Sequence, residues 1–187
     1  MTSRGPESHS RVRLDVVDLI FHRLATYGDL DETNMMPIYH QEDQTYLMCN
    51  GDIYNHKELK QRLISSRIQT QNDCEVLLSY DHTPNLLRGV FASLLWNDRG
   101  KQLHVMRDCF GVRPLFRVFT PTCHLYVSDI RVVSALRTVY GDSDIHVEEI
   151  QPGTREVFSV KPGQSPVRIV KDEWYTLPDP VMEQSNI

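Results

Sequence analysis

Residues 49–57 read Cys-Asn-Gly-Asp-Ile-Tyr-Asn-His-Lys, and they are the most informative residues of the sequence. The preceding residues 45–48, Thr-Tyr-Leu-Met, favour a β-strand. Asn50-Gly51 is a strong turn signal, and Asn55 with Glu58 three positions later has the spacing of a helix capping box. The stretch therefore predicts a strand, a tight turn and a helix in succession.

Asn50 and Gly51 also offer a chemical function. They place a side-chain amide beside a backbone N–H that no side chain obstructs, and such a pair can hold a developing oxyanion. The alternative is an ordinary tight turn, which Asn-Gly makes often. These residues alone favour the turn, so the choice depends on the surrounding sequence.

Outward from this stretch, the apolar spacing predicts a mostly β chain with a few inserted helices. Residues 11–27 are expected to be extended, and a second helix is expected to start at Asn72. Residues 89–97 and 101–106 form a predicted β-hairpin. The remaining elements are expected as strands at 114–119, 123–128 and 154–160 and as a helix at 129–139. This order predicts an α+β layered sandwich.

Composition narrows the class of protein. The chain has 187 residues, of which 40% are hydrophobic and 24% charged, as in soluble globular domains. A net charge of -5 argues against a dedicated nucleic-acid binder, and no segment approaches the ~20 apolar residues of a membrane span. The first residues lack the apolar segment of a secretory signal. We therefore expect a cytoplasmic protein with no nucleic-acid or membrane partner.

The cysteines and histidines show no spacing of metal ligands. The four cysteines, at 49, 74, 109 and 123, include no C-x-x-C pair, and the eight histidines include no H-E-x-x-H. Two disulfides could form, but without a signal peptide we favour reduced thiols. No metal site is expected.

The stretch at 49–57 resembles the signature of class II glutamine amidotransferase domains, specifically those of asparagine synthetase. The resemblance continues in the family's order from residue 4 to about residue 160. The other matching segments are Arg4-Gly5-Pro6-Glu7, Phe21-His22-Arg23-Leu24-Ala25, 73–78, 89–96, 107–116, Ser128-Asp129 and Pro152-Gly153. The resemblance implies a four-layer α/β/β/α sandwich of the Ntn-hydrolase type, with the nucleophile-bearing first strand missing. It also implies a glutamine amidotransferase type-2-like domain at 1–160, followed by a C-terminal extension and loose tail at 161–187.

The resemblance assigns roles at the substrate, L-glutamine. Arg23 is expected to bind its α-carboxylate and Asp73 its α-amino group. The Asn50 side chain and the Gly51 N–H are expected to form the oxyanion hole. Asp52 stands where the family has glutamate and faces the amino end of the substrate, and the lost methylene favours weaker binding. Without the resemblance, Arg23 is an ordinary surface charge and Asp73 a helix-start carboxylate.

The family cleaves glutamine with an N-terminal cysteine whose free α-amine acts as the base. This sequence begins Met1-Thr2-Ser3, and its first cysteine is Cys49. Thr2 is a weak substitute because no apolar strand carries it into a pocket. Cys49 is expected to point away from Asn50, since side chains alternate along a strand. As written, the chain is expected to be unable to hydrolyse glutamine.

The phosphate loop of the family's ATP-using half, S-G-G-x-D-S, has no counterpart in the sequence, nor does G-x-x-x-x-G-K. No cofactor is therefore expected, and a synthetase partner would be a separate domain or chain.

Three interpretations stay open. The chain is an inactive glutaminase-type domain of asparagine biosynthesis, a non-catalytic glutamine-binding or regulatory module that docks on a synthetase chain, or a fragment of a longer gene.

Overall fold

The computed structural model describes residues 8–23, 35–63, 70–80 and 83–175. The strands are β1 (Ser8–Arg13), β2 (Asp18–Arg23), β3 (Ile38–His40), β4 (Thr45–Ile53), β5 (Gly89–Asn97), β6 (Gln102–Arg107), β7 (Phe116–Phe119), β8 (His124–Val127), β9 (His146–Glu149), β10 (Thr154–Ser159) and β11 (Val167–Glu173). The helices are α1 (His56–Arg62), α2 (Leu77–Tyr80) and α3 (Arg131–Tyr140), with short 3-10 helices η4 (Asp73–Val76) and η5 (Pro84–Leu86).

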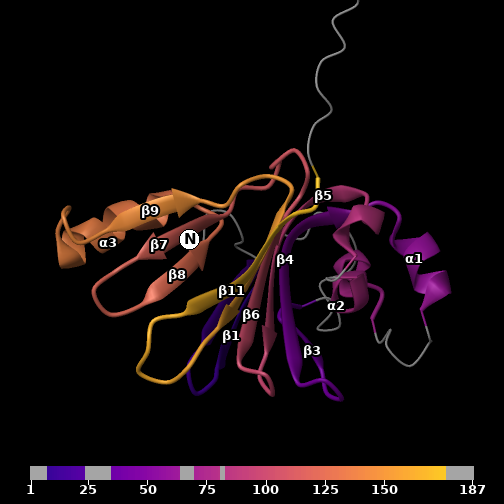
Figure 1. Cartoon of the computed structure of the whole chain (residues 1–187), viewed down its shortest axis with the longest axis horizontal. Coiled ribbons are helices and arrows are strands. Elements are labelled where there is room, and N and C mark those ends of the chain that lie inside the picture. Colours follow the sequence, from indigo (N-terminus) through magenta and orange to yellow (C-terminus); the bar gives the residue numbers. More distant parts are fainter. Residues whose placement is uncertain (1–7, 24–34, 64–69, 81–82, 176–187) are drawn as a thin grey trace, which may run out of the picture.

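A six-stranded sheet of order β11-β10-β6-β5-β4-β3 lies at the centre of the molecule. Two smaller sheets, the hairpin β1-β2 and the three-stranded sheet β8-β7-β9, complete the β structure of the described residues. Figure 1 shows α1 and α2 on one side of the central sheet and the sheet β8-β7-β9 with α3 on the other. The order of layers is therefore helix, sheet, sheet, helix.

Alternation along the central strands produces two cores, one on each face of the sheet. On the helix face, Leu47 and Phe91 pack with Leu59 of α1 and Leu77 of α2. On the other face, the central strands pack against the second sheet layer through Ala92, Trp96, Val105, Leu115 and Ile150. A third cluster joins α3 to the outer face of β8-β7-β9. The predicted α+β, four-layer α/β/β/α sandwich is confirmed.

Most predicted elements occur within a few residues of their expected positions. The extended segment 11–27 contains parts of both strands of the hairpin β1-β2. Strands β3, β9 and β11 were not predicted, because β3 and β9 are too short to show alternation and β11 is an edge strand that is mostly exposed. β11 lies within the predicted extension 161–187 and pairs along β10. The division at residue 160 stays a prediction.

Two local predictions are wrong. β4 continues through Asn50 and Gly51 to Ile53, paired with β5 throughout, so these residues form no tight turn. Asn55 is the N-cap residue of α1, as predicted, but its side chain makes no capping hydrogen bond. Its amide donates to the Leu86 carbonyl at 2.9 Å and accepts from the Arg88 N–H at 3.0 Å. In both cases a contact with the segment that leads into β5 replaces the local structure that the sequence favours.

The Arg4-Gly5-Pro6-Glu7 segment lies outside the described residues, and so does the prediction of a missing first strand. Leu24 and Ala25 lie outside them as well.

Candidate functional site

The candidate site forms at the end of β4, where Asn50, Gly51 and Asp52 follow one another. Asn50 lies opposite Ala92 of β5, which belongs to the core between the two sheet layers. Because side chains alternate along a strand, Asn50 and Asp52 face the second sheet layer. Cys49 lies in the core under the helices. The prediction that Cys49 points away from Asn50 is confirmed.

Gly51 occupies a position that only glycine fits. Its φ is +144°, and a Cβ atom there would lie 2.6 Å from the Phe91 Cα and still closer to the Val90 carbonyl oxygen. Both neighbours are backbone atoms of β5, which cannot move without breaking the β4–β5 ladder. The glycine therefore serves the close approach of two strands.

Asp52 has a partner that the sequence did not predict. Its Oδ2 atom accepts a hydrogen bond from Arg113 Nη2 at 3.0 Å, and both side chains are partly exposed. Arg113 lies in the loop between β6 and β7, 61 residues further along the chain. The structure thus pairs the carboxylate expected to face the substrate's amino end with a guanidinium.

Asp108 organises the loop that carries Arg113. Its carboxylate is fully buried and accepts backbone N–H hydrogen bonds from Phe91 at 3.2 Å, Phe110 at 3.0 Å, Val112 at 3.1 Å and Arg113 at 3.2 Å. A buried carboxylate is stable only when its oxygens are satisfied in this way. Asp108 therefore fixes both the loop and its attachment to β5.

Arg107 supports the same loop from the other side. Its guanidinium donates to the Arg113 carbonyl at 2.9 Å, to the Gly111 carbonyl at 2.7 Å and to Glu149 Oε1 at 2.7 Å. Neither Arg107 nor Asp108 was assigned a role from the sequence. The sequence does place two opposite charges together at the end of an apolar strand. Burying such charges costs free energy unless both form hydrogen bonds or ion pairs, so this pair could have indicated a structural role.

Asp73 reaches the end of β4 from η4. Its Oδ2 atom accepts from the Ile53 N–H at 2.6 Å, and the neighbouring Cys74 thiol donates to the Gly51 carbonyl at 3.4 Å. The Asn72 side chain caps this turn by accepting from the Cys74 N–H at 2.9 Å, as the sequence predicted. The structure thus brings Asp73 to the strand that carries Asn50, Gly51 and Asp52.

Arg23 is the last residue of β2, where it lies opposite Ser8 in the hairpin. Its exposed fraction is only 6%, and it has an interaction partner. It is therefore a buried cation in a different sheet from β4, in contrast to the alternative of an ordinary surface charge.

His56 follows the same strand end and begins α1. Its Nδ1 atom is buried and, within the described part of the chain, has no hydrogen-bond partner. Burial lowers the pKa of His56, although the nearby Asp73 carboxylate raises it. The folded state therefore favours the neutral imidazole more than the unfolded chain does.

The neutral state of His56 makes the stability of the fold depend on pH. As the pH falls below about 6.5, the usual value for histidine, the unfolded chain takes up the proton first. The stability that neutral His56 contributes above this pH is lost on acidification. Urea unfolding from about pH 7.5 to pH 5 is expected to show a steeper decline for the natural protein than for His56→Gln. His146→Gln, at the exposed start of β9, controls for the loss of a histidine, and parallel profiles for His56→Gln and the natural protein would contradict the expectation.

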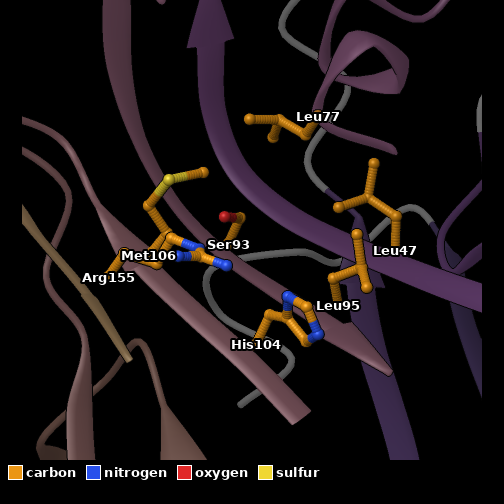
Figure 2. A pocket seen from close by; sticks show the side chains of 7 residues that line it. All are labelled: Leu47, Leu77, Ser93, Leu95, His104, Met106 and Arg155. Atoms are coloured by element: carbon orange, nitrogen blue, oxygen red, sulfur yellow. The ribbon is translucent and has the colours of Figure 1, made fainter. Parts of the chain in front are cut away.

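A small cavity lies on the opposite face of the central sheet, below α2 (Figure 2). Its volume is about 10 Å³, room for one water molecule at most. The lining side chains are Leu47, Leu77, Ser93, Leu95, His104, Met106 and Arg155. Since Ser93 lies opposite Cys49, this cavity is separated by the sheet from Asn50 and Asp52 and is too small for an amino acid.

Across the ranges that the structure describes, no three or more His, Cys, Asp or Glu side chains are grouped so as to hold a metal ion. None of the helices in those ranges is long and apolar enough to span a membrane.

Comparison with known proteins places this chain in a family. Residues 1–178 match the family described as glutamine amidotransferase domain. The chain belongs to this family. The amidotransferase domain is 30% identical over 177 residues to asparagine synthetase [glutamine-hydrolyzing] 1 of Bacillus subtilis, a match that covers 91% of this chain and 27% of that protein. It is 37% identical over 150 residues to asparagine synthetase of Mesocricetus auratus, with 76% of this chain and 26% of that protein covered. The domain thus spans about a quarter of the length of the curated relatives it matches.

Solved structures agree on the fold of this amidotransferase domain. The structure described as the allosteric regulatory enzyme of purine biosynthesis has a TM-score of 0.60 at 22% identity, over 76% of this chain and 33% of that one. Glutamine phosphoribosylpyrophosphate amidotransferase from B. subtilis also has a TM-score of 0.60, at 20% identity, over 81% of this chain and 34% of that one. These two likenesses confirm the predicted fold. The roles of Arg23, Asn50, Gly51, Asp52 and Asp73 stay predictions.

Proposed function

We propose that this amidotransferase domain binds L-glutamine at the end of β4, as the glutamine-binding part of an asparagine-synthetase-type system that makes asparagine from aspartate and glutamine. The observation that carries the proposal is the grouping at one strand end. Asn50, Gly51 and Asp52 lie in sequence on β4, and the Asp73 carboxylate is held at the Ile53 N–H of the same strand. The similarity to asparagine synthetases supports glutamine as the ligand.

The charges of the site match the two ends of an amino acid. In this proposal Asp52 and Asp73 supply negative charge for the α-ammonium group, and Arg23, a buried cation of the hairpin β1-β2, supplies the guanidinium for the α-carboxylate. Since Asp52 is bonded to Arg113, an ammonium group at Asp52 would share this carboxylate with Arg113 or displace it. The Asn50 amide and the Gly51 N–H would then donate to the side-chain carbonyl oxygen of glutamine.

Hydrolysis needs a nucleophile that attacks the side-chain amide carbon, releases ammonia and leaves an acyl group for water to remove. The four cysteines of this sequence are poorly suited to that step. Cys49 and Cys74 lie in the core under the helices, and Cys123 lies in the turn between β7 and β8. Burial raises the pKa of the Cys109 thiol, which keeps it in the less nucleophilic protonated form. We therefore expect binding of glutamine without turnover.

Calorimetric titration of the purified chain with L-glutamine tests this function. Asp73→Asn and Arg23→Gln are each expected to weaken binding about 10- to 100-fold, the loss of one hydrogen bond to a charged group. Arg62→Gln, on the exposed face of α1, is the control and should bind as the natural chain does. Ammonia release should stay at background. Absence of glutamine binding would refute the proposal, and turnover at enzymatic rates would refute the lack of hydrolysis.

The similarity to asparagine synthetases supports a second candidate, a non-catalytic or regulatory module that docks on a synthetase chain. The relatives carry about three-quarters of their length beyond the region matched here. Co-purification of this domain with an asparagine synthetase chain that lacks its own amidotransferase domain tests that role. A stable complex supports it, and separate elution of the two chains contradicts it.

A further inference from the structure

One edge of β4 is only partly covered by a neighbouring strand. β3 pairs with residues 45–47 of β4 and ends there. In an antiparallel ladder, alternate residues direct both backbone groups toward the same side. The Tyr54 N–H donates to the Arg88 carbonyl at 2.7 Å, which places the groups of even-numbered residues toward β5. The backbone groups of Cys49, Gly51 and Ile53 therefore face the other edge, beyond the reach of β3.

Side chains take the place of a strand along this edge. The Cys49 N–H donates to Met36 Sδ at 3.0 Å, the Cys74 thiol donates to the Gly51 carbonyl at 3.4 Å, and the Ile53 N–H donates to Asp73 Oδ2 at 2.6 Å. Two of these three contacts come from adjacent residues of η4. One short turn therefore holds the part of β4 that carries the candidate site.

Gly51 depends on such a contact more than its neighbours do. It lacks a Cβ atom, so its backbone rotates more freely than that of any other residue, and its φ of +144° is rarely adopted by other residues. A hydrogen bond to its carbonyl fixes the peptide plane that follows it. That plane leads directly to Asp52, and its orientation sets the torsion at Gly51 next to the N–H of the candidate oxyanion hole.

The Cys74 thiol is well suited to this contact. Its exposed fraction is 1%, so water does not compete for the thiol proton. The contact with the Cys49 thiol, together with burial, raises the pKa of Cys74 and keeps the thiol protonated at neutral pH. The protonated thiol donates to the Gly51 carbonyl, because a carbonyl oxygen is a stronger acceptor than a thiol sulfur.

We propose that Cys74 is a positioning residue whose thiol, by donating to the Gly51 carbonyl, orients the Gly51 peptide and the Asp52 carboxylate of the candidate site. Its effect on glutamine affinity rests on the function proposed above. Its effect on the Gly51 backbone does not, because the contact exists without a ligand.

Three variants separate this role from simple packing. Cys74→Ala removes the donor, and Cys74→Ser keeps one. Cys49→Ala removes a sulfur atom from the same core but leaves the donor to Gly51 in place. The readouts are the backbone amide resonances of Gly51 and Asp52 and the affinity for L-glutamine. Cys74→Ala is expected to shift both resonances and to weaken binding roughly 3- to 10-fold, the worth of one hydrogen bond of about 1 kcal/mol.

Cys74→Ser is expected to restore the affinity to within about twofold of the natural chain, and Cys49→Ala to stay within the same range. Unchanged resonances in Cys74→Ala would overturn the proposal. So would an equal loss of affinity in Cys74→Ala and Cys49→Ala, or in Cys74→Ala and Cys74→Ser. If the natural chain fails to bind glutamine, the proposed function fails, while the two amide resonances still decide the role of Cys74.

Discussion

Asp108→Ala is expected to lower the free energy of unfolding by about 4 kcal/mol or more, because each hydrogen bond to a charged group contributes about 1.5–3 kcal/mol. The Asp108 carboxylate is fully buried and accepts four backbone N–H hydrogen bonds. Alanine removes all four acceptor contacts at once and leaves a cavity. The loop that carries Arg113 then loses its attachment to β5, so glutamine binding at Asp52 should be lost with it. Urea unfolding and calorimetric titration measure the two effects.

Asp108→Asn and Asp142→Asn are the two comparison variants for this prediction. Asparagine at position 108 keeps one acceptor oxygen, so we expect an intermediate loss of stability. Asp142 follows α3 and its side chain is 88% exposed, so Asp142→Asn should change the free energy of unfolding by less than about 0.5 kcal/mol. A loss below about 1 kcal/mol in Asp108→Ala would contradict the role given to the buried carboxylate.

Gly51→Ala is expected to prevent the native pairing of β4 with β5. A methyl group at this position would overlap the Val90 carbonyl and lie 2.6 Å from the Phe91 Cα, and both are backbone atoms of the neighbouring strand. The strand must then separate or slip, which we expect to cost about 4 kcal/mol or more and to remove the candidate oxyanion site. Circular dichroism and urea unfolding of the variant measure the loss.

Gly163→Ala is the matched control. Gly163 also has a positive φ, +69°, but a Cβ atom there would meet nothing within 4 Å. Its replacement introduces backbone strain without a clash and is expected to cost about 1 kcal/mol. If the two alanine variants were equally stable, the close approach of β4 and β5 would not be the reason for glycine at position 51.

Local patterns in the sequence predicted elements well where a segment depends mainly on its own residues. β5 occupies residues 89–97 as predicted, since its continuous apolar run has the character of a buried strand. Asn72 caps its turn as predicted, because its partner, Cys74, is two residues away. Such features depend on contacts between residues that are neighbours in the sequence.

Local patterns failed where a distant segment competes for the same groups. Asn50-Gly51 favours a turn in isolation, but pairing with β5 holds both residues in a strand. Asn55 favours a helix cap, but its side chain is satisfied by Leu86 and Arg88. In both cases, contacts made across more than 30 residues outweigh a local preference of about 1 kcal/mol.

The order of motifs in the sequence was by itself enough to determine the family and to select Arg23, Asn50, Gly51, Asp52 and Asp73 as the residues to examine. Tertiary structure alone decided what those residues contact. The fold brings Arg113 to donate to Asp52, the Ile53 N–H to donate to Asp73, and the Cys74 thiol to donate to the Gly51 carbonyl. The physical reason is that a motif records which side chains are present, whereas hydrogen-bond partners depend on which backbone groups the completed sheet leaves unpaired.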